Sequence, residues 1–216
     1  MMPRRAKLAI VAFGSSSTEG VGASAPARTY PALLQQELRA ALPAVEVTVL
    51  NRGVGGEDVD DMMRRLPALV AERPDLIIWQ TGSNDSLRQV PVRRFVAETR
   101  AGIRMIRAAQ IDLMLMEPQD CPAIRAIRGS LRYRDAVRMV AAEMNIPLIR
   151  RHDLMHRWIA DGQAASEAAL MSGDDLHMND LGYALLAHAV AQAVLAHRRL
   201  METEPSAPVV AAAKGK

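Results

Sequence analysis

The sequence predicts an α/β domain in which five parallel strands form one sheet and helices cover both of its faces. Short apolar runs alternate along the chain with longer segments in which apolar residues recur at helical spacing. Neighbouring parallel strands need a crossover of about a dozen residues or more, and the helical segments have that length. The 216 residues suit one such domain with a short tail.

The first part of the chain sets this alternation. Leu8–Phe13 is an uninterrupted apolar run that opens into a serine-rich loop, as a buried strand does. A helix is expected over Pro31–Leu42, where leucines follow helical spacing after Thr29, a residue type that caps helices. The β-branched run Val45–Leu50 is the second expected strand. The same pattern continues through a helix over Val59–Glu72, a strand at Leu76–Gln80, a helix over Arg93–Ala109, a strand at Ile111–Met116, a helix over Ser130–Met144 and a strand at Ile146–Ile149.

The C-terminal part of the chain predicts helices and a tail. Two short helices are expected at Leu154–Ala160 and Ala164–Met171, followed by a long one over Asp180–Arg199 that Asn179 or Asp180 caps. Beyond residue 200 the chain is rich in Glu, Pro, Ala and Lys, a composition that does not build a core. The expected organisation is therefore one domain over residues 1–200 and a disordered tail over residues 201–216.

Composition excludes several classes of protein. The longest apolar run, Leu8–Phe13, is far shorter than the roughly 18 residues of a membrane span. The single cysteine, Cys121, excludes an intramolecular disulfide and a multi-cysteine zinc site. The net charge is only +3, its 24 arginines are spread along the chain, and seven residues are aromatic. Nucleic-acid binders concentrate basic and aromatic residues on one face, so no nucleic-acid partner is expected.

Reactive side chains gather at the expected strand ends. In an open parallel sheet the loops at the carboxyl ends of strands carry binding and catalytic groups. The four segments concerned are Gly14-Ser-Ser-Ser-Thr18, Asn51-Arg-Gly-Val-Gly-Gly56, Gly82-Ser-Asn-Asp85 and, before the last helix, Asp174-Asp-Leu-His177. Together they supply a hydroxyl, a glycine amide, a carboxamide, a carboxylate and an imidazole.

These four segments, in this order, resemble the blocks of the SGNH hydrolases, also called GDSL esterases, from residue 10 to about residue 184. The resemblance implies a flavodoxin-like three-layer α/β/α sandwich and a Ser-His-Asp triad made of Ser16, His177 and Asp174. It also implies an oxyanion hole formed by Ser16, Gly56 and Asn84. No metal or organic cofactor is implied.

The chemistry of these residue types fits the implied roles. A serine hydroxyl becomes a good nucleophile when a neighbouring base removes its proton. An imidazole, with an unperturbed pKa near 6.5, is largely neutral at neutral pH and can act as that base. Ser15 stands where the family has Asp, so three hydroxyls follow one another, and the register of Gly14 and Thr18 selects Ser16 as the nucleophile. We expect the Ser15 substitution to alter loop rigidity more than chemistry.

The predicted function is a serine esterase that hydrolyses short-chain, acetyl-type acyl esters through an acyl-enzyme. The substrate is a small-molecule or carbohydrate ester, and the loops near the four blocks lack the aromatic lining of a deep apolar site. Two alternatives remain open from the residues: a flavodoxin-like flavin-binding module and a glycan-binding relative without hydrolase activity. The serine-rich loop resembles a phosphate-binding loop, although the strand-end loops have no aromatic residue on which a flavin would stack.

Two basic features have more than one interpretation. His152 and His156 lie four residues apart and could form a metal pair, but the sequence has neither an HExxH pattern nor a third ligand nearby, which favours a structural role. Arg125, Arg128, Arg132 and Arg134 either favour an anionic leaving group beside the site or form a solvated helix face.

The N-terminus bears on localisation. The basic start Met1–Lys7 and the sequence Ala23–Ala25 resemble parts of a signal peptide, but the apolar stretch between them has only about six residues. Cleavage after Ala25 would remove Ser16 and is incompatible with the esterase. The expected location is cytoplasmic by default, or secreted or periplasmic if another leader was removed; the sequence does not indicate the oligomeric state.

Overall fold

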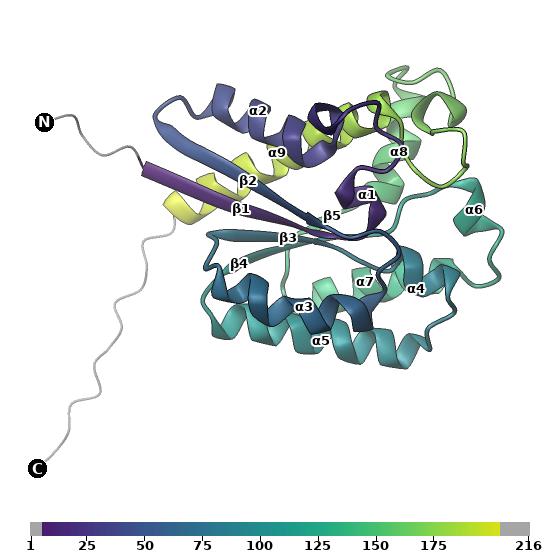
Figure 1. The fold of residues 1–216 in the computed structure, drawn as a ribbon, viewed down its shortest axis with the longest axis horizontal. Coiled ribbons are helices and arrows are strands. Elements are labelled where there is room, and N and C mark those ends of the chain that lie inside the picture. The colour runs from purple at the N-terminus through teal and green to yellow at the C-terminus, as the bar shows by residue number, and fades with distance from the viewer. Residues whose placement is uncertain (1–5, 204–216) are drawn as a thin grey trace, which may run out of the picture.

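In the computed structural model, which describes residues 6–203, five strands form one parallel sheet in the order β2-β1-β3-β4-β5 (Figure 1). Each connection between paired strands crosses over through a helix, which makes the parallel arrangement possible. The strands are β1 Ala6–Gly14, β2 Val45–Gly53, β3 Leu76–Gln80, β4 Asp112–Met116 and β5 Leu148–Ile149. The predicted flavodoxin-like sheet of five strands is confirmed.

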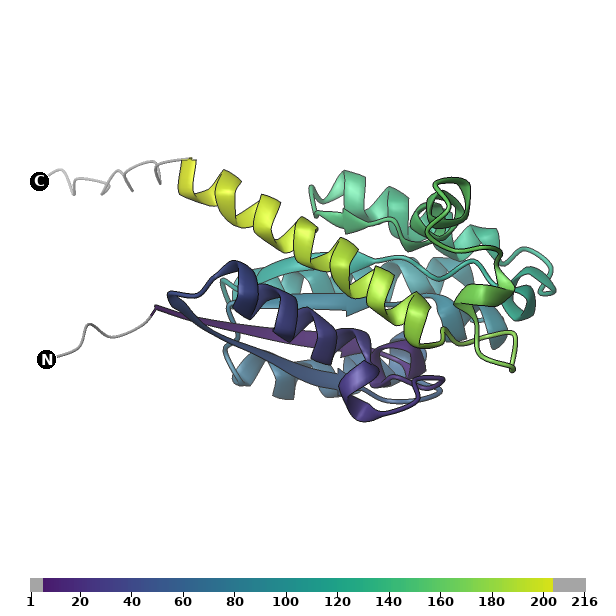
Figure 2. The ribbon, with the colours of Figure 1, turned by 90° about the horizontal axis from the view of Figure 1, so that it is seen from above.

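Helices cover both faces of the sheet, as Figures 1 and 2 show. One face carries α2 Tyr30–Ala41, α8 Arg151–Ala160 and α9 Asp180–Thr203. The other face carries α3 Val59–Ala71, α5 Val92–Ala108 and α7 Leu131–Glu143. The fold is therefore the expected three-layer α/β/α sandwich.

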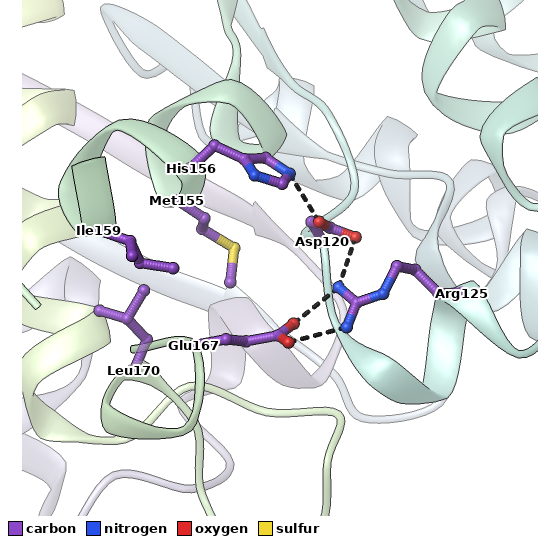
Figure 3. Close-up of a pocket in the computed structure, with 7 residues that line it drawn as sticks. All are labelled: Asp120, Arg125, Met155, His156, Ile159, Glu167 and Leu170. Carbon is purple, nitrogen blue, oxygen red and sulfur yellow. Dashed lines mark hydrogen bonds and ion pairs between the residues drawn. The ribbon is translucent and has the colours of Figure 1, made fainter. Parts of the chain in front are cut away.

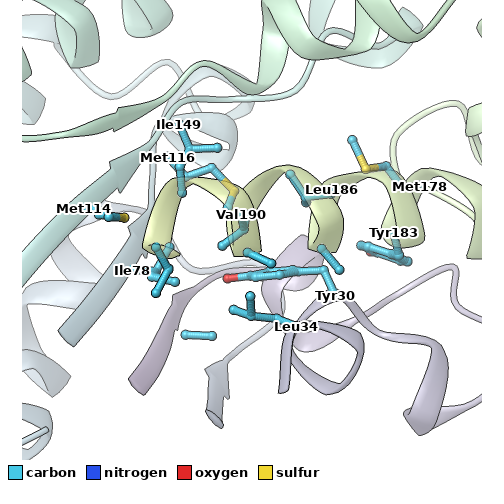
Figure 4. Packing of buried hydrophobic residues seen from close by; sticks show 14 of the residues in the cluster. Tyr30, Leu34, Ile78, Met114, Met116, Ile149, Met178, Tyr183, Leu186 and Val190 are labelled. Atoms are coloured by element: carbon cyan, nitrogen blue, oxygen red, sulfur yellow. The ribbon is translucent and has the colours of Figure 1, made fainter. Parts of the chain in front are cut away.

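Strand β1 shows how one segment serves both layers. Ile10 and Ala12 point to the face covered by α2 and α9, whereas Val11 and Phe13 point to the face covered by α3 and α5. All four are completely buried, because side chains alternate across a strand and both faces are covered. On the α2 and α9 side, Tyr30 and the other residues of Figure 4 fill the space between sheet and helices.

Most expected elements lie where the sequence places them, but Ala164–Met171 is not a helix. Only Ala168–Leu170 forms a single 3-10 turn. Met171 takes an extended backbone because it pairs with Met178 in an antiparallel bridge. The side chain of Asn179 donates to the carbonyls of Ala169 and Met171, at 2.9 and 3.1 Å. In a continued helix these carbonyls would instead accept from backbone N–H groups four residues further on.

Other boundaries also differ from expectation. Short helical turns occupy segments expected as loops: α1 Ser16–Glu19, α4 Ser83–Leu87, α6 Pro122–Arg125 and the 3-10 turn Pro26–Arg28. Thr29 precedes α2 as expected, but its hydroxyl donates to the carbonyl of Pro26 rather than capping the helix. The last helix begins after Asn179, whose side chain accepts from the N–H of Gly182. That helix continues to Thr203, so the rest of the expected tail, residues 204–216, lies outside the described residues.

The strand order places two of the predicted blocks beside each other. Strands β1 and β3 are neighbours, and their connections leave toward opposite edges of the sheet, so their carboxyl ends form the topological switch point where α/β proteins commonly bind ligands. Helix α1 follows β1 and α4 follows β3, so Ser16 and Asn84 both lie at this switch point. Among residues 6–203, no helix has the length and apolar character that a bilayer span requires.

Candidate active site

Ser16 is positioned by a loop that is anchored to strand β3. The buried Ser15 donates from both its N–H and its hydroxyl to Oε1 of Gln80, at 3.0 and 3.1 Å. Thr18 donates to the same oxygen at 3.3 Å. Ser17 is also buried, and its hydroxyl contacts no polar group among the described residues. Of the three consecutive serines, only Ser16 is partly exposed.

His177 and Asp174 lie directly opposite Ser16. Nε2 of His177 is 2.8 Å from Oγ of Ser16, and Nδ1 of His177 is 2.5 Å from Oδ2 of Asp174. The other carboxylate oxygen of Asp174 accepts from the N–H groups of Leu176 and His177, at 3.0 and 2.9 Å, and from the hydroxyl of Ser172 at 2.8 Å. The 174–177 turn thus orients the carboxylate, and the carboxylate orients the ring.

The same contacts determine the charge of Asp174. Partial burial alone would raise the pKa of this carboxyl, but the hydrogen bonds from the His177 ring and N–H, from Ser172 and from Leu176 outweigh it. The pKa of Asp174 therefore lies well below its ordinary value, and the group is an anion at neutral pH. The adjacent Asp175 has a left-handed backbone, φ 57°, and among the described residues only Asp174 places a carboxylate on the His177 ring.

The loop between β2 and α3 passes beside Ser16. Asn51 donates from Nδ2 to the carbonyl of Glu19 at 3.1 Å, which ties this loop to α1. A Cβ added at Gly55 would lie 3.9 Å from Cβ of Ser16 and 2.8 Å from the Glu19 carboxylate. Gly56 has a φ of 79°, a conformation that glycine adopts without strain. Among the described residues, the N–H groups of Ser16 and Gly56 donate to no acceptor.

Asn84 and Asp85 connect the β3–α4 turn to the same loop. Nδ2 of Asn84 donates one of its hydrogens to the carbonyl of Glu57 at 2.8 Å. The buried carboxyl of Asp85 accepts from the N–H of Val59 at 2.9 Å and from that of Gly82 at 3.2 Å. Burial outweighs these bonds and raises the pKa of Asp85 to about 6.

The structure thus brings Ser16, His177 and Asp174 into direct contact. It places Gly56 on the loop whose Gly55 lies beside Ser16, and it joins Asn84 to the same loop through Glu57. Sequence reasoning missed three residues that hold them, namely Gln80, Asp85 and Ser172. Gln80 did carry a signal, since it is a polar residue at the end of an otherwise apolar strand. Cys121, expected to be a spare thiol, is fully buried, and burial raises the pKa of its thiol to about 11.

A cavity of about 610 Å³ adjoins α1. It is bounded by the segment from Glu19 to Pro26, by the start of α2, and by Val49 and Asn51 of β2. Its lining mixes small, polar and apolar residues and includes no Phe or Trp. Glu19, at the end of α1, lines this cavity, whereas Ser16, Asp174 and His177 do not.

Comparison with known proteins places these observations in a family. The sequence model of the non-GDSL lipase-like family matches residues 2–197. The chain belongs to the non-GDSL lipase-like family. The predicted resemblance to the SGNH hydrolases is thereby confirmed.

Relatives of this non-GDSL lipase-like chain are hydrolases by name. It is 28% identical over 91 residues to an arylesterase of Vibrio mimicus, covering 42% of this chain and 44% of that protein. It is 26% identical over 141 residues to thioesterase 1/protease 1/lysophospholipase L1 of Escherichia coli K12, covering 65% and 64%. The alignments therefore span less than two thirds of these curated relatives. The names support the predicted enzyme class, a carboxylic ester hydrolase.

A solved structure agrees with the fold of this family member. The lipase/acylhydrolase from Enterococcus faecalis superposes with a TM-score of 0.73 at 25% identity, over 88% of this chain and 96% of that one. The similarity extends over nearly the whole of the solved domain.

Proposed function

We propose that this protein is a serine esterase that hydrolyses short-chain acyl esters through an acyl-enzyme on Ser16. The observation that carries the proposal is the contact of 2.8 Å between Oγ of Ser16 and Nε2 of His177, with Asp174 behind the ring. The names of the relatives, an arylesterase and a thioesterase/lysophospholipase, support ester hydrolysis as the reaction class.

His177 moves the proton in this mechanism. Oγ of Ser16 attacks the acyl carbon while Nε2 of His177 takes the hydroxyl proton, and the anionic Asp174 stabilises the imidazolium that forms. The imidazolium then gives the proton to the leaving alcohol oxygen as the ester bond breaks. A water molecule repeats the sequence on the acyl-enzyme, releasing the acid and restoring Ser16.

The oxyanion of the tetrahedral intermediate requires donors that are fixed in advance. The N–H groups of Ser16 and Gly56 are available for this role, and Nδ2 of Asn84 keeps a second hydrogen beside the one it gives to Glu57. Removing one such donor typically costs about 2.7–4 kcal/mol of transition-state stabilisation.

We expect this protein to prefer short acyl groups to long ones. A long chain requires a continuous apolar channel, whereas the cavity beside α1 is open and mixes Glu19, Ser24, Thr29, Gln35 and Asn51 with its apolar residues. The proposed substrate is accordingly an acetyl-type ester of a small molecule or a carbohydrate.

A series of nitrophenyl esters tests this proposal. We expect kcat/KM to be highest for acetate or butyrate and to fall for octanoate and palmitate, with Ser16→Ala as the inactive blank. A maximum at octanoate or longer would contradict the short-chain preference. Absence of turnover for every ester would instead favour the glycan-binding alternative, and a yellow purified protein would favour flavin binding.

A further inference from the structure

Two histidines and a carboxylate meet on the outer side of the loop that follows β4. His152 and His156 lie one turn apart on α8, and their ring centroids are 5.0 Å apart. Asp120 comes from the β4–α6 connection and reaches both rings. Figure 3 shows the contact between Asp120 and His156. Oδ2 of Asp120 is 2.7 Å from Nε2 of His156, and Oδ1 of Asp120 is 3.9 Å from Nε2 of His152. The third ligand that the sequence did not reveal is thus supplied by a residue more than thirty positions away.

We propose that Asp120, His152 and His156 bind a divalent transition-metal ion of the Zn²⁺ class. One ligand atom from each residue lies within 4.8 Å of the others. Zn²⁺ binds histidine nitrogen and carboxylate oxygen at about 2.0–2.2 Å, so its tetrahedral ligands lie about 3.4 Å apart. Rotation of the exposed His156 side chain adjusts these separations, since Asp120 is buried and His152 is partly buried. Imidazole and carboxylate together suit this class of ion better than Ca²⁺ or Mg²⁺, which prefer all-oxygen sites.

The surroundings of His152 indicate which nitrogen is available. A guanidinium nitrogen of Arg134 is 3.4 Å from Nε2 of His152. A guanidinium only donates, so Nε2 faces it with a lone pair, which is the form that a metal ion needs. The opposite nitrogen, Nδ1, lies 3.5 Å from Oδ1 of Asp153. This nitrogen is buried and has no hydrogen-bond partner among the described residues.

Nearby arginines set the strength of the site. Arg125 contacts Oδ1 of Asp120 at 2.9 Å but is also paired with both oxygens of Glu167, at 2.7 and 2.8 Å (Figure 3). Glu167 therefore offsets the positive charge next to Asp120. Arg134 is paired with Asp135 at 2.7 Å. The two arginines compete with a cation for the ligand atoms, so we expect their removal to tighten binding.

The ligands are reachable from solvent on two sides. A cavity of about 270 Å³ exposes Asp120 and His156, with Met155, Ile159 and Leu170 as its apolar wall (Figure 3). A second cavity, of about 470 Å³, exposes Asp120 and His152. Water or another small ligand can therefore complete the coordination sphere.

A bound ion would fix a loop that touches the candidate active site. Gln119, next to Asp120, accepts from the hydroxyl of Ser83 at 2.9 Å and donates to the carbonyl of Leu176 at 3.1 Å. Ser83 precedes Asn84, and Leu176 precedes His177. The ion would therefore link α8 to this loop. Its three ligands are not among the residues proposed for ester hydrolysis.

The test is Zn²⁺ titration of the full chain after treatment with a chelator. We expect one Zn²⁺ per chain by calorimetry and a higher midpoint of thermal unfolding, because a ligand that binds only the folded state stabilises it. Co²⁺ used in place of Zn²⁺ should give visible d–d absorption bands. His156→Ala should weaken Zn²⁺ binding by at least about tenfold and abolish the shift in midpoint. Arg134→Gln should strengthen binding.

His188→Ala is the matched control. The side chain of His188 is 63% exposed and lies 3.0 Å from Glu37, and that of His156 is 61% exposed and lies 2.7 Å from Asp120. His188→Ala should bind Zn²⁺ like the natural chain, as should His177→Ala. Absence of a stoichiometric site, unchanged binding in His156→Ala, or loss of binding in His177→Ala would each overturn the proposal.

Discussion

Three consecutive serines at the end of β1 differ in what their hydroxyls contact. Ser15 donates to Gln80, Ser17 is buried without a polar contact among the described residues, and Ser16 reaches His177. The Asp of the family pattern is replaced by Ser15, whose hydroxyl still ties the loop to β3. Identical side chains are thus given different roles by the direction in which the backbone presents them.

Asp174 and Asp175 are also identical neighbours with different contacts, and this difference can be tested by mutation. Asp174 contacts the ring of His177 at 2.5 Å, whereas Asp175 makes no contact with that ring among the described residues. Asp174→Asn should lower kcat by up to about 10⁴-fold, the scale for loss of an orienting carboxylate. Asp175→Asn is the matched control and should keep nearly full activity. Steady-state kinetics with a nitrophenyl acetate ester measures both, and an equal loss in the two variants would contradict a unique partner for the ring.

At the scale of elements, the β2–α3 loop must hold Gly56 with a φ of 79°. Gly56→Ala should cost about 1–2 kcal/mol of stability, because a left-handed backbone strains any residue with a Cβ. Gly56→Ala should also lower kcat, because the backbone relieves the strain by moving the N–H of residue 56 away from the oxyanion of the intermediate. Gly162, with a φ of 71° and open space around its Cβ position, is the control. Gly162→Ala should lose similar stability in urea unfolding and retain kcat; an undiminished kcat in Gly56→Ala would remove Gly56 from the site.

Asp85 links two further elements, the start of α3 and the β3–α4 turn, through Val59 and Gly82. Burial raises its pKa from 3.8 to about 6. Below the ordinary value the carboxyl is protonated in both folded and unfolded chains. As pH rises from the ordinary value to the folded pKa, the unfolded chain ionises while the folded chain keeps its proton, so the contribution of Asp85 to stability declines and is lost once the folded carboxyl also ionises.

The substitution Asp85→Asn removes the pH dependence of stability that comes from this carboxyl. The free energy of unfolding of the natural chain minus that of Asp85→Asn should fall by at most about 3 kcal/mol between about pH 4 and about pH 7. Urea unfolding of both chains across this range provides the measurement. The subtraction cancels carboxyls that do not interact with Asp85, such as Asp174, whose pKa is lowered. A difference that does not change with pH would show that Asp85 is not the titrating group.

At the scale of the whole molecule, regular elements and the site blocks were predictable for one physical reason. Buried parallel strands such as Leu76–Gln80 are continuous apolar runs, and their ends are where polar loops begin. Three of the blocks follow strands directly and the fourth precedes the last helix. Ser16, Gly56, Asn84 and His177 were therefore expected at the end of the sheet where the carboxyl ends of the strands lie. All of these expectations depend on local sequence.

What the sequence did not predict depends on contacts between distant segments. Ala164–Met171 has a helical composition, but pairing of Met171 with Met178 makes its end extended. Gln80 holds Ser15 across 65 positions, and Asp120 meets His156 only because the β4–α6 loop folds onto α8. Such contacts leave no periodic signal in the sequence.

The central claim, that Ser16 is the nucleophile, is tested most directly by covalent labelling with diethyl nitrophenyl phosphate. Attack by an activated serine forms a bond from Oγ to phosphorus, breaks the bond to the nitrophenyl oxygen and releases nitrophenolate. Mass spectrometry of the intact chain and fragmentation of the peptide Leu8–Arg28 locate the label. The account predicts one diethylphosphoryl group on Ser16 in the natural chain and in Ser17→Ala, and none in Ser16→Ala. A label on Ser15, Ser17 or any other residue, or ester hydrolysis that persists in Ser16→Ala, would contradict it.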